Sequence, residues 1–391
     1  MKVLHLIEGL GSGGAERVLY TNLKHLNSEL IESEVVTTFS NRDHWKKPIQ
    51  ELGIKVSSLD CRSPKDIRRG ISNLRAKIKE TKPDVIHTHL WTANIIGRIA
   101  GSLCKIPVVS SVHSTDYAPE AISDGSQISA SKRFFIRNLD NLTTRFACQK
   151  ILAVSEYVKK STSQQLGIAL EEIEVLYNPI DISDLQPNAS HRKSEFLRDE
   201  LNVSADALIL LSIARFSHQK GLIYAVRALP EIKEKFPNAH LVFAGSGDDF
   251  AYLTKVKNEI TALRLNDSVH FLGVRRDIPD LLQFCDVFVF PSLHEGLGIA
   301  LIEAMAVGCP SVATRTGPIP EFVEHQVNGL LTAPKNAENL SENVCRLLAN
   351  ADERNRLGNA ARETVLSKFQ PQAASDKLTE IYFSMLRAKT V

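Results

Sequence analysis

Short apolar runs alternate with amphipathic stretches along the first half of the chain. Seven runs are predicted to form strands: Lys2–Ile7, Glu34–Phe39, Ile54–Leu59, Asp84–Thr88, Pro107–Val112, Lys150–Val154 and Ile173–Leu176. Between them, apolar residues recur every three or four positions, as in Ala15–Leu26 and Thr92–Leu103, which predicts helices with one buried face. Continuous apolar strands separated by helices indicate a parallel sheet covered on both faces. Residues 1–185 are therefore predicted to form a doubly wound α/β domain.

The same alternation restarts after a polar stretch at about 181–206. Five further runs are predicted to form strands: Leu208–Ile213, His240–Ala244, Val269–Leu272, Asp286–Phe290 and Pro310–Thr314. We therefore expect a second Rossmann-like domain at 200–370, and a C-terminal helix at about 371–391 that packs back on the first domain. Two such domains are expected to face a central cleft, with the carboxyl ends of their strands toward it.

Composition and charge narrow the class of protein. The chain has 391 residues, of which 43% are hydrophobic and 24% charged, as in ordinary globular proteins. Lys plus Arg number 47 against 45 Asp plus Glu, so the charge of +2 argues against an electrostatic nucleic-acid binder. Six cysteines without a C-x-x-C pair indicate reduced thiols in the cytoplasm. No apolar run approaches the ~20 residues of a spanning helix, so any membrane contact is expected to be peripheral, on the inner face.

A glycine-rich loop, Gly9–Gly14, follows the first predicted strand and precedes a helix, and it satisfies G-x-G-x-x-G. A dinucleotide site should also have an acidic residue at the end of the second strand, but that strand ends in Ser40-Asn41-Arg42. An arginine there could accept a 2′-phosphate, so an NADP-dependent oxidoreductase is one alternative. Two other interpretations are a loop whose amides approach another ligand, and a tight turn without any ligand.

The most informative residues lie in the second half. Glu295 is predicted on a loop after a buried strand, and Glu303 lies inside an apolar helix that starts near Gly298. A carboxylate in apolar surroundings is costly unless it is paired, so both acids could hold ligand hydroxyls; the alternative for Glu303 is an ordinary solvated position. Arg215 and Lys220 follow another strand and together suit a diphosphate, the alternative being simple solvent exposure.

These residues resemble the motifs of the retaining glycosyltransferases of family 4, which have the two-domain GT-B fold. Glu295 and Glu303 fit the family's E-x7-E motif within 291–310, and 273–282 and 328–331 also resemble family segments. The sequence departs from the pattern at Pro318, where the family often has a second glycine, and this removes one backbone N–H.

The resemblance implies an enzyme that moves a hexose or N-acetylhexosamine from a nucleotide-diphosphate sugar, with UDP expected, to a glycan or lipid-linked acceptor. It implies retention of configuration by a front-face mechanism, with no metal and no other cofactor. A GT-B nucleotide-sugar epimerase is a further alternative. The catalytic residues implied are His113, Arg215, Lys220 and Glu295. The donor-binding residues implied are Gly13, Gly14, Arg215, Lys220, Gly245, Val274, Glu295, Gly296, Leu297, Gly298, Ile299, Ala300, Leu301 and Glu303. The acceptor-side candidates are Glu16, Asp116, Ser155 and Asn178.

Two further expectations concern metals and membranes. The chain has no D-x-D motif, and His87 and His89 are expected to point to opposite faces of a strand, so no metal site is predicted. The segment 131–146 combines cations and aromatics at helical spacing. It is expected either to dock on an anionic membrane or to pack its aromatics on the first domain.

Overall fold

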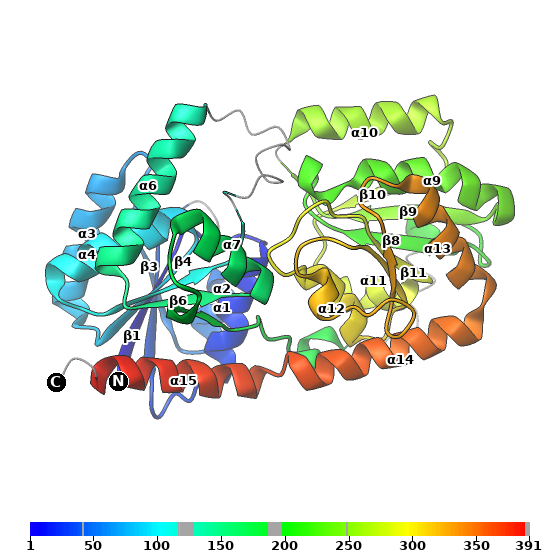
Figure 1. Ribbon diagram of the computed structural model, residues 1–391. Helices are drawn as coiled ribbons and strands as arrows, with labels where there is room; N and C mark the ends of the chain where they lie inside the picture. Colours follow the sequence, from blue (N-terminus) through cyan, green and yellow to red (C-terminus); the bar gives the residue numbers. More distant parts are fainter. Residues whose placement is uncertain (41–42, 116, 118–128, 187–197, 248, 388–391) are drawn as a thin grey trace. The chain divides into compact units, whose positions relative to one another are not determined.

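Two parallel β-sheets, each in a structural unit of its own, organise the chain (Figure 1). The computed structural model describes residues 1–40, 43–115, 117, 129–186, 198–247 and 249–387. Of these, the first unit contains 1–40, 43–115, 117, 129–179 and 369–387. The second contains 180–186, 198–247 and 249–368.

The sheet of the first unit has seven parallel strands in the order β3-β2-β1-β4-β5-β6-β7. Their bounds are β1 Lys2–Ile7, β2 Glu32–Thr37, β3 Lys55–Ser58, β4 Val85–His89, β5 Val108–Val112, β6 Lys150–Ala153 and β7 Ile173–Val175. The central strands are buried along most of their length, which is why the sequence shows them as continuous apolar runs. The predicted doubly wound sheet is confirmed.

Helices cover both faces of this sheet. The helices α1 Gly14–His25, α2 Lys46–Glu51 and α15 Pro371–Arg387 share one apolar core with alternate residues of β1, β4 and β5. On the other face lie α3 Ile67–Thr81 and α4 Trp91–Cys104. The helix α6 Ala130–Ala147 packs on α4, and α7 Glu156–Leu166 packs on β6 and β7. The short 3-10 helix η1 Leu170–Glu172 precedes β7.

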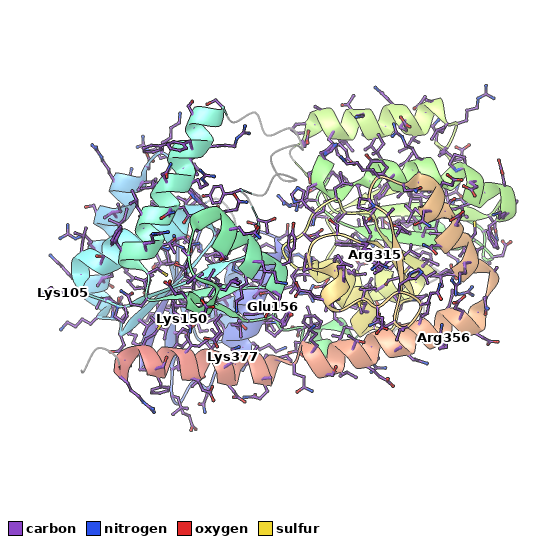
Figure 2. All side chains as sticks on the ribbon, viewed as in Figure 1. Lys105, Lys150, Glu156, Arg315, Arg356 and Lys377 are labelled. Atoms are coloured by element: carbon purple, nitrogen blue, oxygen red, sulfur yellow. The ribbon has the colours of Figure 1, made fainter. Side chains whose placement is uncertain are left out.

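The predicted return of the C-terminal helix to the first unit is confirmed. In α15, Leu378 and Tyr382 are buried in the same core as β1 and β4. Ser375 Oγ donates to the backbone oxygen of His25 at 2.8 Å. Lys377, labelled in Figure 2, donates to the Val175 oxygen at 2.9 Å and pairs with Glu174 at 3.2 Å. Residues more than 200 positions apart in sequence therefore stabilise one unit.

The second unit has six parallel strands in the order β10-β9-β8-β11-β12-β13. Their bounds are β8 Leu208–Ile213, β9 Ala239–Ala244, β10 Val269–Gly273, β11 Val287–Phe290, β12 Ser311–Thr314 and β13 Leu330–Thr332. The last strand was not predicted, because three residues are too few to show a period. The helices that complete the unit are α9 Leu222–Lys235, α10 Phe250–Ala262, α11 Ile278–Phe284, α12 Ile299–Ala306, α13 Ala337–Ala349 and α14 Ala351–Lys368.

The boundary between the units lies slightly earlier than the predicted domain limit at residue 185. The 3-10 helix η2 Ile182–Leu185 packs against α11 and α12, so residues 180–185 belong to the second unit. Residues 187–197 of the predicted linker lie outside the described residues. Among the helices that the structure describes, none is both long and apolar enough to cross a membrane.

Candidate active site

The carboxyl ends of β8 and β11 bring the two charged motifs of the second unit together. Lys220 ends the 3-10 helix η3 His218–Lys220, just after β8, and Glu295 lies on the loop that follows β11. Lys220 Nζ and Glu295 Oε1 are 2.6 Å apart, and the two side chains are only 15% and 6% exposed. Because water is largely excluded, this pair interacts more strongly than one on the surface. Residues 75 positions apart thus form one charged site.

Two hydrogen bonds and one close backbone approach hold the loop after β8 against the loop after β11. Leu293 N donates to the Gln219 oxygen at 2.8 Å, and Gln219 Nε2 donates to the His294 oxygen at 3.0 Å. Gly221 follows with φ +61°, and a Cβ there would overlap the backbone oxygen of Pro291. Only glycine permits both the left-handed backbone and this close approach. The loop after β8 therefore rests directly on the loop after β11, which places Lys220 beside Glu295.

Glu303 lies inside the apolar helix α12, as the E-x7-E spacing predicts. The helix starts after Gly298, which has φ +94°, and Glu303 is its fifth residue. Glu303 is buried at 4% exposed, so the alternative of an ordinary solvated position is wrong. At the start of the helix, Leu301 N donates to the Gly298 oxygen at 3.0 Å. The start of α12 still directs the positive end of its dipole toward this edge of the sheet.

The remaining predicted donor residues differ in their surroundings. Arg215 is exposed directly after β8, and in the described part of the chain no ion pair engages its guanidinium. Val274 is 53% exposed after β10. Gly245 N donates to the Gly273 oxygen at 2.7 Å, and its φ of +133° places a Cβ position against Ala214. Close packing against Ala214 is therefore enough to explain why residue 245 is a glycine. Arg215 and Val274, in contrast, are exposed and can contact a ligand.

In the first unit, the glycine loop is covered by a carboxylate of its own helix. Gly13 is the N-cap of α1, and Glu16 is buried in the first turn at 7% exposed. A Cβ on Gly13 would overlap the Glu16 carboxylate. A negative charge at this helix start disfavours a pyrophosphate in the same place. The geometry therefore argues against the dinucleotide alternative, while Arg42, on which it rested, lies outside the described residues.

His113 follows β5 and contacts another histidine rather than a carboxylate. Its Nε2 lies 3.2 Å from His89 Nδ1. Burial lowers the pKa of His113 to about 4, so the ring is neutral near pH 7 and acts as a hydrogen-bonding group. The expectation that His87 and His89 point to opposite faces is wrong: their ring centroids are 4.1 Å apart. Residues two positions apart on a strand share a face, because the side chains alternate with a period of two.

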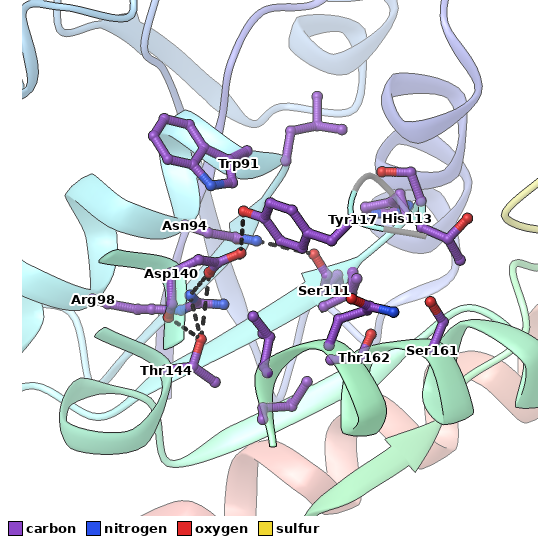
Figure 3. A pocket seen from close by; sticks show the side chains of 17 residues that line it. Trp91, Asn94, Arg98, Ser111, His113, Tyr117, Asp140, Thr144, Ser161 and Thr162 are labelled. Carbon is purple, nitrogen blue, oxygen red and sulfur yellow. Dashed lines mark hydrogen bonds and ion pairs between the residues drawn. The ribbon is translucent and has the colours of Figure 1, made fainter. Parts of the chain in front are cut away.

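His113 also lines a cavity of about 60 Å³ in the first unit (Figure 3). Arg98 and Asp140 form an ion pair at 2.6 Å beside it, with Arg98 only 1% exposed. Tyr117 Oη donates to Asp140 Oδ2 at 3.0 Å, so the charges there are compensated internally. Among the described residues, Trp91 Nε1 and Asn94 Oδ1 are buried without a hydrogen-bond partner. Such a cavity suits water or a neutral hydroxylated group better than a phosphate.

Sequence reasoning missed most of this cavity. Trp91 and Asn94 stand at the start of the helix that follows β4, which is where ligand-binding residues of open α/β sheets lie, and this position was the available signal. Of the acceptor-side candidates, Ser155 is fully buried and caps α7, its Oγ accepting from Val158 N at 3.1 Å. Asn178 is buried, and Asp116 lies outside the described residues.

The fold and the donor-side residues define a class of protein. Two doubly wound parallel units, with the C-terminal helix in the first and an E-x7-E motif in the second, are the features of GT-B glycosyltransferases. The family model of group 1 glycosyl transferases matches residues 193–364, and that of Glycosyltransferase Family 4 matches residues 12–184. The chain belongs to glycosyltransferase family 4 and is a GT-B glycosyltransferase.

Individual relatives agree with this assignment. An uncharacterized glycosyltransferase of Methanocaldococcus jannaschii is 32% identical over 305 residues, 77% of this chain and 75% of that one. A UDP-Gal:α-D-GlcNAc-diphosphoundecaprenol α-1,3-galactosyltransferase of Escherichia coli is 26% identical over 95% of this chain and 94% of that one. The crystal structure of Anabaena HepE in complex with UDP-glucose superposes with a TM-score of 0.84 at 25% identity, covering 98% of this chain and 100% of that one.

Proposed function

We propose that this glycosyltransferase transfers a hexose or N-acetylhexosamine from a UDP-sugar, with retention of configuration, to a lipid-linked or glycan acceptor. The observation that carries the proposal is the 2.6 Å contact between Lys220 and Glu295, which joins the basic motif to the E-x7-E motif at one edge of the second sheet. The likeness to HepE, whose structures contain UDP, glucose and UDP-glucose, supports UDP as the nucleotide.

Each of the four charged motif residues of the second unit has a role in this reaction. When the bond between the anomeric carbon and the diphosphate breaks, negative charge grows on the diphosphate, and Arg215 and Lys220 are placed to stabilise it. Glu295, already beside Lys220, accepts hydrogen bonds from hydroxyls of the transferred sugar. Glu303 holds the ribose, whose hydroxyls donate to its buried carboxylate. None of these roles requires a covalent bond to the protein.

The two cations after β8 support a front-face transfer without a metal. Arg215 and Lys220 can neutralise the diphosphate, so the protein itself supplies the positive charge. The departing phosphate oxygen then accepts the proton of the acceptor hydroxyl on the same face as the leaving group, which retains the configuration. His113, neutral and hydrogen-bonded, contributes a hydrogen bond from the first unit, as the family resemblance implies.

The acceptor side of the proposal rests on α6. Phe135, Leu142 and Phe146 are 68%, 56% and 79% exposed, and their spacing of seven and four places them along one stripe of the helix. The alternative in which these aromatics pack on the first domain is therefore wrong. Lys132, Arg133, Arg137 and Arg145 lie on the same helix. Apolar and basic side chains on one helix suit an anionic leaflet, so we propose peripheral binding at the cytoplasmic face, where a lipid-linked acceptor is presented.

A ligand panel tests the proposal. UDP is expected to raise the melting temperature more than GDP, ADP or NADP, and a UDP-sugar is expected to be consumed with release of UDP and transfer to an acceptor of retained configuration. Stabilisation by NADP alone would contradict the nucleotide-sugar site. Binding of UDP-sugar followed by epimerisation, without transfer to any acceptor, would instead favour the GT-B epimerase.

A further inference from the structure

Three histidines meet inside the first unit, away from the donor residues. His5 of β1 is the register partner of His87 of β4, and His89 lies two positions further on the same strand. All three lie on the sheet face that α1 and α15 cover, since their neighbours Val3, Ile7 and Val85 belong to that core. One ring nitrogen of each lies within 4.8 Å of the others, and all three residues are buried.

The cluster contains polar atoms that the described residues leave unsatisfied. His5 is 1% exposed, and in the described part of the chain neither of its ring nitrogens has a hydrogen-bond partner. The same holds for His89 Nε2. Buried polar atoms are normally paired, because an unpaired one loses its hydration without compensation. Unpaired nitrogens on His5 and His89, in one cluster with His87, indicate a ligand that contacts all three rings at once.

The outer contacts of the rings suit metal ligation. A ligating histidine usually donates its other N–H to a nearby acceptor, which fixes its tautomer. His89 Nδ1 lies 3.2 Å from His113 Nε2, so its Nε2 is left for an ion. His87 lies 2.6 Å from Tyr382 Oη through Nδ1 and 2.8 Å from Ser111 Oγ through Nε2. On binding an ion, His87 can give up one of these two hydroxyl contacts and keep the other.

We propose that His5, His87 and His89 form a site for one zinc-class transition-metal ion, with the fourth position filled by water. Imidazole nitrogens suit Zn²⁺, Cu²⁺ and Ni²⁺, whereas Mg²⁺ and Ca²⁺ need oxygen ligands. Zn–N bonds of about 2.0–2.1 Å place ligand nitrogens closer together than the 4.8 Å within which these three lie, so binding requires the rings to move toward one another.

The ion would connect the sheet to the cavity of the first unit. With His89 held as a ligand, its Nδ1–H donates to His113 Nε2, so the proton of His113 is on Nδ1. His113 lines the cavity, and in the described residues its buried Nδ1 has no partner. The site therefore acts on His113 as a positioning element, separately from the diphosphate residues in the second unit.

Metal analysis of the full chain, produced without a polyhistidine tag in zinc-supplemented medium, tests the site. About one zinc per chain is expected, with X-ray absorption showing imidazole nitrogens in the first shell. His5→Gln and His89→Gln are expected to lose the ion. The matched control is His270→Gln, which breaks the other histidine pair, His240 Nδ1 to His270 Nε2 at 3.1 Å, and is expected to keep it.

Three results would overturn the site. The first is wild-type protein without zinc above the buffer blank, both as produced and after refolding with zinc; a buried water then fills the cluster. The second is an absorption spectrum without imidazole ligands. The third is zinc that is lost in His270→Gln but retained in His5→Gln. The wild-type spectrum decides even where a histidine variant does not fold, and none of these results depends on which sugar donor the enzyme uses.

Discussion

The two units share one architecture but differ in where their ion pairs lie. In the second unit, Lys220 and Glu295 form their ion pair at the carboxyl edge of the sheet, and Arg215 is exposed just after β8. In the first unit, the ion pair of Arg98 and Asp140 is internal, and the neighbouring histidines are neutral. Both sheets are parallel and doubly wound, so the difference comes from the loops and helix starts at the strand ends. The same fold thus offers charge to a ligand in one unit and neutral polar groups in the other.

The largest effect is expected from Asp140→Ala, which tests whether the buried ion pair of Arg98 and Asp140 stabilises the fold of the first unit. The substitution leaves the Arg98 guanidinium buried without its partner. Removing one member of a buried pair costs about 3–5 kcal/mol, so the unfolding free energy of the first unit should fall by that amount. Chemical denaturation measures it. The control is Glu259→Ala, which breaks the exposed pair with Arg227 and should cost roughly 0–1 kcal/mol. Equal losses for the two variants would contradict the comparison.

Arg215→Ala in the second unit should have the opposite result, with stability unchanged and activity lost. Arg215 is exposed and has no ion pair among the described residues, so the melting temperature should stay close to that of the wild type. Losing one positive donor at the leaving group should lower the transfer rate roughly 10²–10³-fold. Arg362→Ala, an exposed arginine of α14, is the control and should leave the rate unchanged. A fully active Arg215→Ala would remove this residue from the donor site.

Glu303→Gln should give a smaller and more selective effect. The amide keeps the size of the buried side chain but weakens its hydrogen bonds to a ribose, which are worth about 1.5–3 kcal/mol for a charged acceptor. The affinity for UDP should therefore fall about 10–100-fold, while inhibition by pyrophosphate, which has no ribose, should not change. Calorimetry and competition assays measure the two. A parallel loss of both ligands would indicate that Glu303 supports the fold of the site and not the ribose.

Phe135→Ser tests the membrane surface of the first unit. Insertion of one phenyl ring into a leaflet stabilises binding by about 1.5–3 kcal/mol, so the substitution should reduce binding to anionic vesicles about tenfold or more. Vesicle co-sedimentation measures it, with Phe250→Ser as the control, because Phe250 of α10 is 73% exposed in the second unit. Equal vesicle binding by the two variants, or a change in oligomeric state in place of a loss of binding, would refute a membrane role for α6.

The smallest effect is expected from divalent cations. EDTA, Mg²⁺ or Mn²⁺ added at the start of the assay should leave the transfer rate unchanged, because Arg215 and Lys220 neutralise the diphosphate. An ion buried in the proposed histidine site is expected to exchange slowly, so EDTA added at the start is not expected to remove it during the assay. An immediate loss of rate with EDTA, restored by Mg²⁺, would place a metal at the donor after all.

Particular residues show how far the sequence could be interpreted. Strands β1 and β8 begin and end at the predicted residues, because a buried parallel strand is a continuous apolar run between polar loops. The motifs predicted that Lys220 and Glu295 both serve the donor site, but their direct contact depends on a glycine that lets two loops touch. The histidine cluster was not predicted, because His87 and His89 were expected on opposite faces, whereas residues two positions apart on a strand share one face. Its third member, His5, could be added only once the register of β1 against β4 was known.

The order of apolar and polar positions was enough to predict two parallel α/β units and a C-terminal helix, and motif spacings with a family resemblance implied the donor residues. These features depend on local periodicity and on short spacings within one loop or helix, which a linear pattern contains. Tertiary structure alone decided which charges are compensated inside the protein and which are open to a ligand. Arg98 and Arg215 have the same side chain, yet one meets Asp140 across a helix interface and the other meets solvent. That difference arises from the packing of segments distant in sequence, and no local pattern records it.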